Sequence, residues 1–276
     1  MDDIKKVVQE KYSQIATQTK EQNAPSCCGS VSCGSIVDYS VFSESYDEQE
    51  GYVPDADLGL GCGLPTEYAG IKPGNTVLDL GSGAGNDCFV ARALVGDEGY
   101  VAGIDFTEAM VEKARENTRK LGYSNVDFIL GDIENIPVRF GVVDVVISNC
   151  VLNLVPDKQK AFSEIYRVLK QGGHFCISDV VLQGELPNEL RDDAAMYAGW
   201  VAGALQQDQY LGIIKEAGFI NVDVKKAKKI ELPDDLLLKY LTADKLEQFK
   251  SGVTGIFSIT VTAQKPEGCG CGCSCS

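Results

Sequence analysis

Cysteine is the side chain that most clearly offers chemistry in this sequence, because eleven cysteines occur among 276 residues. A thiolate is both a nucleophile and a ligand for soft metal ions. Cys150 directly follows an apolar run, VVDVVISN, and Cys62 lies between two glycines in LGLGCGLP. Flanking glycines give a loop little packing reason to hold a cysteine but let a sulfur approach a ligand closely. We therefore take Cys62 and Cys150 as candidate site residues, with plain packing in the core as the alternative.

The other cysteines fall into three groups. Cys88 and Cys176 lie in apolar stretches, and we expect them in the core. The loop APSCCGSVSCGS carries three more thiols, and the closing GCGCSCS has the alternating pattern of a flexible multidentate ligand for soft ions. The members of these last two groups are Cys27, Cys28 and Cys33 in the loop and Cys269, Cys271, Cys273 and Cys275 in the tail.

A glycine-rich loop offers a second kind of chemistry. The stretch VLDLGSGAGND follows a predicted strand and opens a predicted helix, with glycines that allow a tight turn and a close approach to a ligand; they are Gly81, Gly83 and Gly85. Asp105, at the end of the next predicted strand, is placed to accept hydrogen bonds from ribose hydroxyls. The loop alone is a weak signal, because dehydrogenases use a similar one.

Two details favour S-adenosylmethionine over a dinucleotide as the ligand of this loop. The spacing is G-x-G-x-G, which lacks the third glycine that seats a pyrophosphate, and Asp79 precedes Gly81 where a carboxylate can meet a cation. Asp132 ends the third strand, where it could bind the adenine amino group with Ile133 against the ring. We assign Phe106 and Asn149 to the same cofactor site.

The elements that must position these groups alternate between strands and helices. We predict strands over 76–80, 99–105, 125–130, 142–148 and 174–181, with helices over 86–93, 107–121 and 157–170 between them. Several of these strands are continuously apolar, which favours a parallel sheet covered on both faces. Residues 4–16 have helical apolar spacing, and further helices near 188–204, 207–217 and 234–249 alternate with strands near 219–228 and 255–263.

The predicted fold is an α/β, Rossmann-like sheet with a smaller α+β C-terminal region. We divide the chain into an N-terminal helix and thiol-bearing loop, a cofactor-binding domain, an accessory domain and a disordered cysteine-rich tail; the ranges are 1–50, 51–183, 184–265 and 266–276. The single histidine, His174, excludes zinc sites built on histidine pairs, and we expect it to be structural.

Charge narrows the possible partners. The net charge of −15 repels phosphate backbones and anionic membrane surfaces, so we expect neither nucleic acid nor a membrane as a partner. The start of the chain lacks an apolar signal-peptide core, and no run of 18 apolar residues occurs. We therefore expect a cytoplasmic protein with reduced thiols, in which cysteines serve as ligands or catalysts.

Taken together, these motifs resemble a known family. DLGLGCGLP, VLDLGSGAGNDCFV and DVVISNCVLNLVPDK are similar to signatures of the arsenite S-adenosylmethionine methyltransferases, and RVLKQGGHF is typical of class I methyltransferases in general. AGWVAGALQQDQYLGIIKEAGF resembles the C-terminal segment of the same family. The resemblance covers about residues 20–265.

The resemblance implies methylation of trivalent arsenic for detoxification. Arsenic(III) is soft and would bind to Cys62 and Cys150, with Cys33 and Cys28 as further candidate ligands and the tail thiols as a scavenging tether. The arsenic lone pair would attack the donor methyl, and because arsenic gives up no proton no general base is needed. Glutathione or thioredoxin would supply electrons. We expect a monomer.

One position departs from the family pattern. Members carry a cysteine in A-G-C-[IV]-x-G-A-L, where this chain has AGWVAGAL with Trp200 at the cysteine position. A thiolate ligand is therefore lost, which predicts activity that is weakened or shifted toward methylated arsenicals, unless other thiols compensate. Two alternatives remain: a methyltransferase for a small organic acceptor, and a thiol-rich arsenic-binding or metal-binding protein with little turnover.

Overall fold

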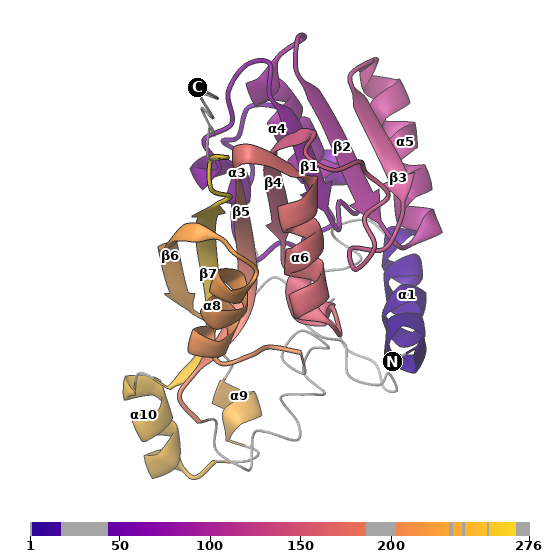
Figure 1. The fold of residues 1–276 in the computed structure, drawn as a ribbon. Coiled ribbons are helices and arrows are strands. Elements are labelled where there is room, and N and C mark those ends of the chain that lie inside the picture. Colours follow the sequence, from indigo (N-terminus) through magenta and orange to yellow (C-terminus); the bar gives the residue numbers. More distant parts are fainter. Residues whose placement is uncertain are drawn as a thin grey trace, which may run out of the picture.

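The computed structural model describes residues 2–17, 44–185, 203–231, 234–238, 241–252 and 254–268 (Figure 1). One seven-stranded sheet organises them, in the order β3-β2-β1-β4-β5-β7-β6. The strands are β1 (Thr76–Leu80), β2 (Tyr100–Asp105), β3 (Val126–Leu130), β4 (Val143–Asn149), β5 (Leu169–Gln183), β6 (Ile220–Lys229) and β7 (Gly255–Gln264). Strands β1 to β5 are parallel, as predicted, and β7 is antiparallel to both β5 and β6.

Helices cover both faces of this sheet. The described helical elements are α1 (Asp2–Ala16), η2 (Pro54–Ala56), α3 (Pro65–Tyr68), α4 (Asn86–Val95), α5 (Glu108–Leu121), η3 (Leu152–Leu154), α6 (Lys158–Val168), α8 (Gln207–Glu216), α9 (Asp234–Leu237) and α10 (Ala243–Ser251). Helices α6 and α8 pack on one face, and α4 and α5 pack on the other with α1 beside α5 (Figure 1). The Rossmann-like prediction is confirmed.

Three local features differ from the sequence-based expectation. The parallel sheet gains two strands, of which only β7 runs antiparallel to β1–β5, so the predicted regions 51–183 and 184–265 share one sheet. Helix α6 ends at Val168 rather than near residue 170, because Leu169 already pairs with Val143 and the following glycines form an irregularity inside β5. The predicted helix 234–249 is divided into α9 and α10, and Thr242 Oγ1 accepts from the Lys245 N–H at the start of the second.

Each apolar face of the sheet has its own core. Phe162, Phe175 and Tyr210 pack together under α6 and α8, whereas Cys88 and Cys176 are fully buried in the core on the side of α4. The expectation that these two cysteines are core residues is thus confirmed. Among the described residues, no helix is both long and apolar enough to cross a membrane.

Candidate active site

The glycine loop joins β1 to α4 by a tight turn. Gly81, Gly83 and Gly85 have φ values of 72°, 51° and 100°, in the left-handed region that favours glycine. The Gly81 and Ser82 N–H groups donate to the Ile104 carbonyl at 2.7 and 3.0 Å. A Cβ atom on Gly81 would collide with Val151, whereas one on Gly83 would meet no atom within 4 Å. The loop therefore lies against the chain after β4 and leaves open space beside Gly83.

Asp105, at the end of β2, fixes the same loop. Its Oδ2 accepts from the Gly83 N–H at 3.0 Å and its Oδ1 from the Thr107 N–H at 2.8 Å. Burial raises the pKa of its carboxyl, and these backbone hydrogen bonds oppose the rise. The sequence predicted only that Asp105 binds a ribose. Its carboxylate also fixes the glycine loop, a role that the sequence did not indicate.

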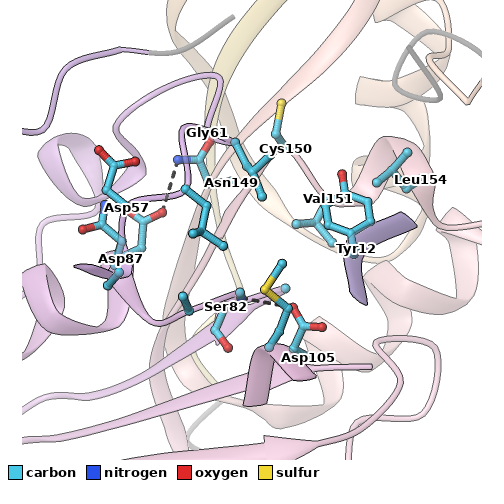
Figure 2. A pocket seen from close by; sticks show the side chains of 18 of the residues that line it. Tyr12, Asp57, Gly61, Ser82, Asp87, Asp105, Asn149, Cys150, Val151 and Leu154 are labelled. Carbon is cyan, nitrogen blue, oxygen red and sulfur yellow. Dashed lines mark hydrogen bonds between the residues drawn. The ribbon is translucent and has the colours of Figure 1, made fainter. Parts of the chain in front are cut away.

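A cavity opens at the carboxyl ends of β1, β2 and β4. It holds about 820 Å³ of empty space, including the part open to solvent. Its walls come from α1, the segment 56–61, the glycine loop, the start of α4 and residues 149–154 (Figure 2). This is the crevice where open α/β sheets bind their ligands. Phe106 and Ile133 line both this cavity and an adjoining hollow that also includes Asp132.

Two buried polar atoms in the cavity wall lack a partner. Among the described residues, Ser82 Oγ and Asn86 Oδ1 make no hydrogen bond, although both are shielded from solvent. Buried polar groups are nearly always hydrogen-bonded, so such atoms beside a cavity fit a polar ligand.

Tyr46, Asp87 and Asn149 form a hydrogen-bond network on one wall of the cavity. The Tyr46 hydroxyl donates to Asp87 Oδ1 at 2.9 Å, and Asn149 Nδ2 donates to Asp87 Oδ2 at 3.2 Å. Burial raises the pKa of Asp87 to about 6, opposed by the hydrogen bonds from Tyr46 and Asn149. Asp57 lies on the same side and accepts from the Tyr52 hydroxyl at 3.0 Å (Figure 2). These acids give the cavity a wall suited to a cation.

Asp79 lies outside the hollows that most of the other predicted cofactor residues line. It is buried in β1, accepts a hydrogen bond from Cys88 Sγ at 3.3 Å, and is not part of the described cavity wall. Burial and the nearby Asp87 raise the pKa of its carboxyl. Asp87, eight residues further along, occupies the cavity wall where the sequence led us to expect Asp79.

Cys62 and Cys150 are brought together, as the choice of both as site residues requires. They form a disulfide with their Cα atoms 5.6 Å apart, and their exposed fractions are 1% and 2%. Cys150 lines the cavity and has a φ of 59°, which is rare for a residue other than glycine (Figure 2). Its N–H donates to the Ser178 carbonyl at 2.8 Å. Strained backbone of this kind clusters at functional sites.

The remaining site predictions fall outside the described residues. They concern the loop thiols Cys27, Cys28 and Cys33, the position of Trp200, and the tail thiols Cys269, Cys271, Cys273 and Cys275. Within the described part of the chain, no group of three or more histidine, cysteine or acidic side chains could hold a metal ion. His174 contacts the Ala69 carbonyl, which fits the expected structural role.

Sequence reasoning missed several cavity residues. Asp87 had a signal, because an acid in the first turn after a glycine loop points toward the ligand crevice. Tyr46, Asp57 and Tyr12 had none, since they are distant in sequence from the loop they meet.

Comparison with known proteins indicates a methyltransferase. A family model described as a methyltransferase domain matches residues 71–218. The arsenite methyltransferase of Halobacterium salinarum is 44% identical over 235 residues, which cover 81% of this chain and 59% of the relative. That of Aquipseudomonas alcaligenes is 32% identical over 241 residues, covering 85% of this chain and 67% of the relative.

A solved structure agrees with these relatives. The crystal structure of an arsenic(III) S-adenosylmethionine methyltransferase from Chlamydomonas reinhardtii matches with a TM-score of 0.63 and 37% identity, covering 75% of this chain and 68% of that one. This chain spans less than two thirds of the length of the Halobacterium and mouse relatives. The chain belongs to the methyltransferases and, within them, to the arsenite methyltransferase family.

Proposed function

We propose that this protein transfers a methyl group from S-adenosylmethionine to trivalent arsenic held by the thiolates of Cys62 and Cys150. One observation carries the proposal: these two sulfurs are bonded to each other, and Cys150 lines the cavity formed by the glycine loop. Two sulfurs at bonding distance can also bridge a single soft atom once they are reduced. The names of the relatives support the same substrate.

The cavity wall fits the proposed methyl donor. Asp105 and the open backbone at Gly83 suit a ribose, and the free Ser82 Oγ and Asn86 Oδ1 offer further polar contacts. Phe106 and Ile133 offer apolar surface for the adenine, with Asp132 at the adjoining hollow. When bound, S-adenosylmethionine supplies an electrophilic methyl on a sulfonium, and the acidic wall at Asp87 suits that positive charge.

The thiols must be reduced before they bind arsenic. A two-electron reductant, which we take to be glutathione or thioredoxin, would convert the Cys62–Cys150 disulfide to two thiols. Each thiol then replaces one hydroxyl of trivalent arsenic and releases water. This need for reduced thiols fits the cytoplasm, where we place the protein. We propose that the protein is a monomer there.

Catalysis in this site is positioning in a dry pocket. The buried thiolates hold arsenic with its lone pair free, and no side chain needs to remove a proton because arsenic loses none. The lone pair forms the new arsenic–carbon bond as the carbon–sulfur bond of the donor breaks. The reductant then supplies the two electrons that return arsenic to the trivalent state.

Substrate preference depends on the number of thiols. With Trp200 at the family's cysteine position, we propose that methylarsenite, which has two exchangeable bonds, is preferred over arsenite. A third sulfur for arsenite would come from Cys28, Cys33, the tail thiols or a small thiol. Initial rates with both substrates test this: equal arsenite turnover by the natural protein and by Trp200→Cys contradicts it.

Product analysis tests the function itself. Mass spectrometry after incubation with arsenite or methylarsenite, isotope-labelled S-adenosylmethionine and glutathione should find labelled methylated arsenic. Cys62→Ser and Cys150→Ser should abolish it, whereas Cys176→Ala, which removes a buried thiol elsewhere, should not. Labelled organic product that survives both serine variants would identify an organic acceptor instead. Arsenic binding without labelled product would identify a binding protein.

A further inference from the structure

The backbone around Cys62 is held by side chains from two distant strands. The Cys62 N–H donates to Asn149 Oδ1 at 3.0 Å, and the Cys62 carbonyl accepts from Ser258 Oγ at 2.6 Å. Asn149 Nδ2 also donates to the Gly63 carbonyl at 2.8 Å. We infer that Asn149 and Ser258 are positioning residues that hold the Cys62 thiol beside Cys150. The reason for holding the two thiols together rests on the proposed function, whereas the hydrogen bonds that hold them do not.

The orientation of the Asn149 amide is fixed by its surroundings. Nδ2 faces three acceptors, the Gly63 carbonyl, the Tyr46 hydroxyl at 2.6 Å and Asp87 Oδ2 at 3.2 Å. The opposite atom, Oδ1, faces the Cys62 N–H. The flipped amide would place Oδ1 against the Gly63 carbonyl and the Asp87 carboxylate and Nδ2 against the Cys62 N–H, so only the observed orientation is favourable. The residue directly before Cys150 therefore binds the Cys62 N–H and the Gly63 carbonyl, and one side chain links the backbones around the two cysteines.

Ser258 contributes from the far end of the chain. It lies in β7, opposite Val180 of β5 and Lys228 of β6, and its side chain is 7% exposed. Because β7 is hydrogen-bonded on both edges, the Ser258 hydroxyl is a fixed anchor for a segment that has no strand partner of its own. The C-terminal strands therefore contribute directly to the thiol site.

The glycines that flank Cys62 allow this close docking. A Cβ on Gly61 would lie 2.7 Å from Asn149 Nδ2, and one on Gly63 would lie 2.5 Å from Ser178 Oγ. Any larger residue would push the loop away from β4 and β5. The glycines thus serve the approach of the loop to its anchors, which explains their presence around a buried cysteine.

Preorganisation of this kind raises the effective concentration of one thiol beside the other. A loop that is free in the reduced protein must be ordered before both sulfurs can bind one atom, and that ordering opposes binding. The hydrogen bonds from Asn149 and Ser258 supply the order in advance. Their loss should weaken every process that joins the two sulfurs, including disulfide formation and arsenic capture.

The closing experiment needs no arsenic. The full-length protein is equilibrated with mixtures of reduced and oxidised glutathione, and differential alkylation with peptide mass spectrometry reads the oxidised fraction at Cys62 and Cys150. Ser258→Ala should lower the equilibrium constant for disulfide formation by about tenfold, the effect of one net hydrogen bond. Asn149→Asp should lower it further, because a carboxylate oxygen would face the Gly63 carbonyl and Asp87.

Ser148→Ala is the matched control. It removes another buried serine hydroxyl, which donates to the Leu80 carbonyl at 2.8 Å, one residue before Asn149, without touching Cys62. The control should stay within about twofold of the natural protein, and Ser258→Thr should restore most of the equilibrium constant. If Ser258→Ala and Asn149→Asp also stay within about twofold, or if Ser148→Ala falls as far as they do, the positioning role is wrong.

Kinetics separates this inference from the proposed function. Ser258→Ala should raise the KM for methylarsenite and leave the Kd for S-adenosylmethionine unchanged, because the Ser258 hydroxyl binds the Cys62 carbonyl and Ser258 does not line the donor cavity. An equal rise in both constants contradicts the inference. Should even the natural protein methylate no arsenical, the proposed function fails, while the glutathione equilibria still decide the positioning role.

Discussion

The donor half and the thiol half of the site are built in opposite ways. In the donor half, residues 79–107 carry both the glycine loop and Asp105, and hydrogen bonds from backbone N–H groups within that segment hold them. In the thiol half, Cys62 and Cys150 are 88 residues apart and side chains hold them, from Tyr46 near one end of the chain to Ser258 near the other. The glycine loop and its acid therefore come from one local segment, whereas the thiol half needs the completed sheet.

This difference predicts that the two halves can be damaged separately. Asn149 and the neighbouring Asp87 lie at the boundary, because both line the cavity and both belong to the network behind the Cys62 loop. Substitutions away from that boundary should affect one half and leave the other intact.

The largest effect is expected in the glycine loop. Gly81→Ala would drive a Cβ into Val151 at a φ of 72°, which should destabilise the fold by about 3 kcal/mol and abolish donor binding. Gly83→Ala places its Cβ in open space and should cost about 1 kcal/mol, the left-handed backbone penalty. Denaturant unfolding and calorimetry of S-adenosylmethionine binding measure both. Equal stability of the two variants would refute the packing argument.

An intermediate effect is expected at Asp105. Asp105→Asn removes the charge that accepts from the Gly83 and Thr107 N–H groups and should weaken S-adenosylmethionine binding about 30-fold, as for a hydrogen bond to a charged group. The glutathione equilibrium of Cys62 and Cys150 should not change. A shift in that equilibrium as large as the loss of donor affinity would show that the two halves are not separable.

A smaller effect is expected from pH. Burial raises the pKa of Asp87 to about 6, so this carboxyl holds a proton below pH 6 and is charged above it. A cationic donor favours the charged form, so its affinity should rise with pH up to about 6 and then level off, by at most about tenfold per unit. Calorimetry from pH 5 to pH 7.5 measures the trend, and Asp87→Asn should flatten it. A flat profile in the natural protein would mean that Asp87 does not face the positive charge of the donor.

The same contrast explains how much the sequence could predict. The parallel strands β1 to β5, the turn of the glycine loop and the place of Asp105 at the end of β2 follow from short apolar runs and from fixed spacing, and these features are confirmed in the fold. Cys62 and Cys150 could be chosen because each stands beside a strong local signal. The two cysteines are bonded to each other in the structure, which agrees with that choice. Their role in binding arsenic stays a prediction.

The rest depends on contacts without a local signature. No pattern links Ser258 to Cys62, because the hydrogen bond joins positions 196 residues apart and requires β7 to insert between β5 and β6. The antiparallel direction of β7 was missed for a similar reason, since its apolar run is compatible with either direction. Asp79 was expected in the cavity wall because its spacing from the glycine loop is right, but its side chain turns into the core toward Cys88.

Single-turnover methyl transfer tests the central claim most directly. The reduced protein is loaded with one equivalent of methylarsenite, mixed with isotope-labelled S-adenosylmethionine, and quenched over time to count label on arsenic. The natural protein should transfer label, and Cys62→Ser and Cys150→Ser should each be slowed by at least about 100-fold while binding the donor with unchanged affinity. Transfer at the natural rate by either variant would contradict the claim that this pair of thiols holds the arsenic.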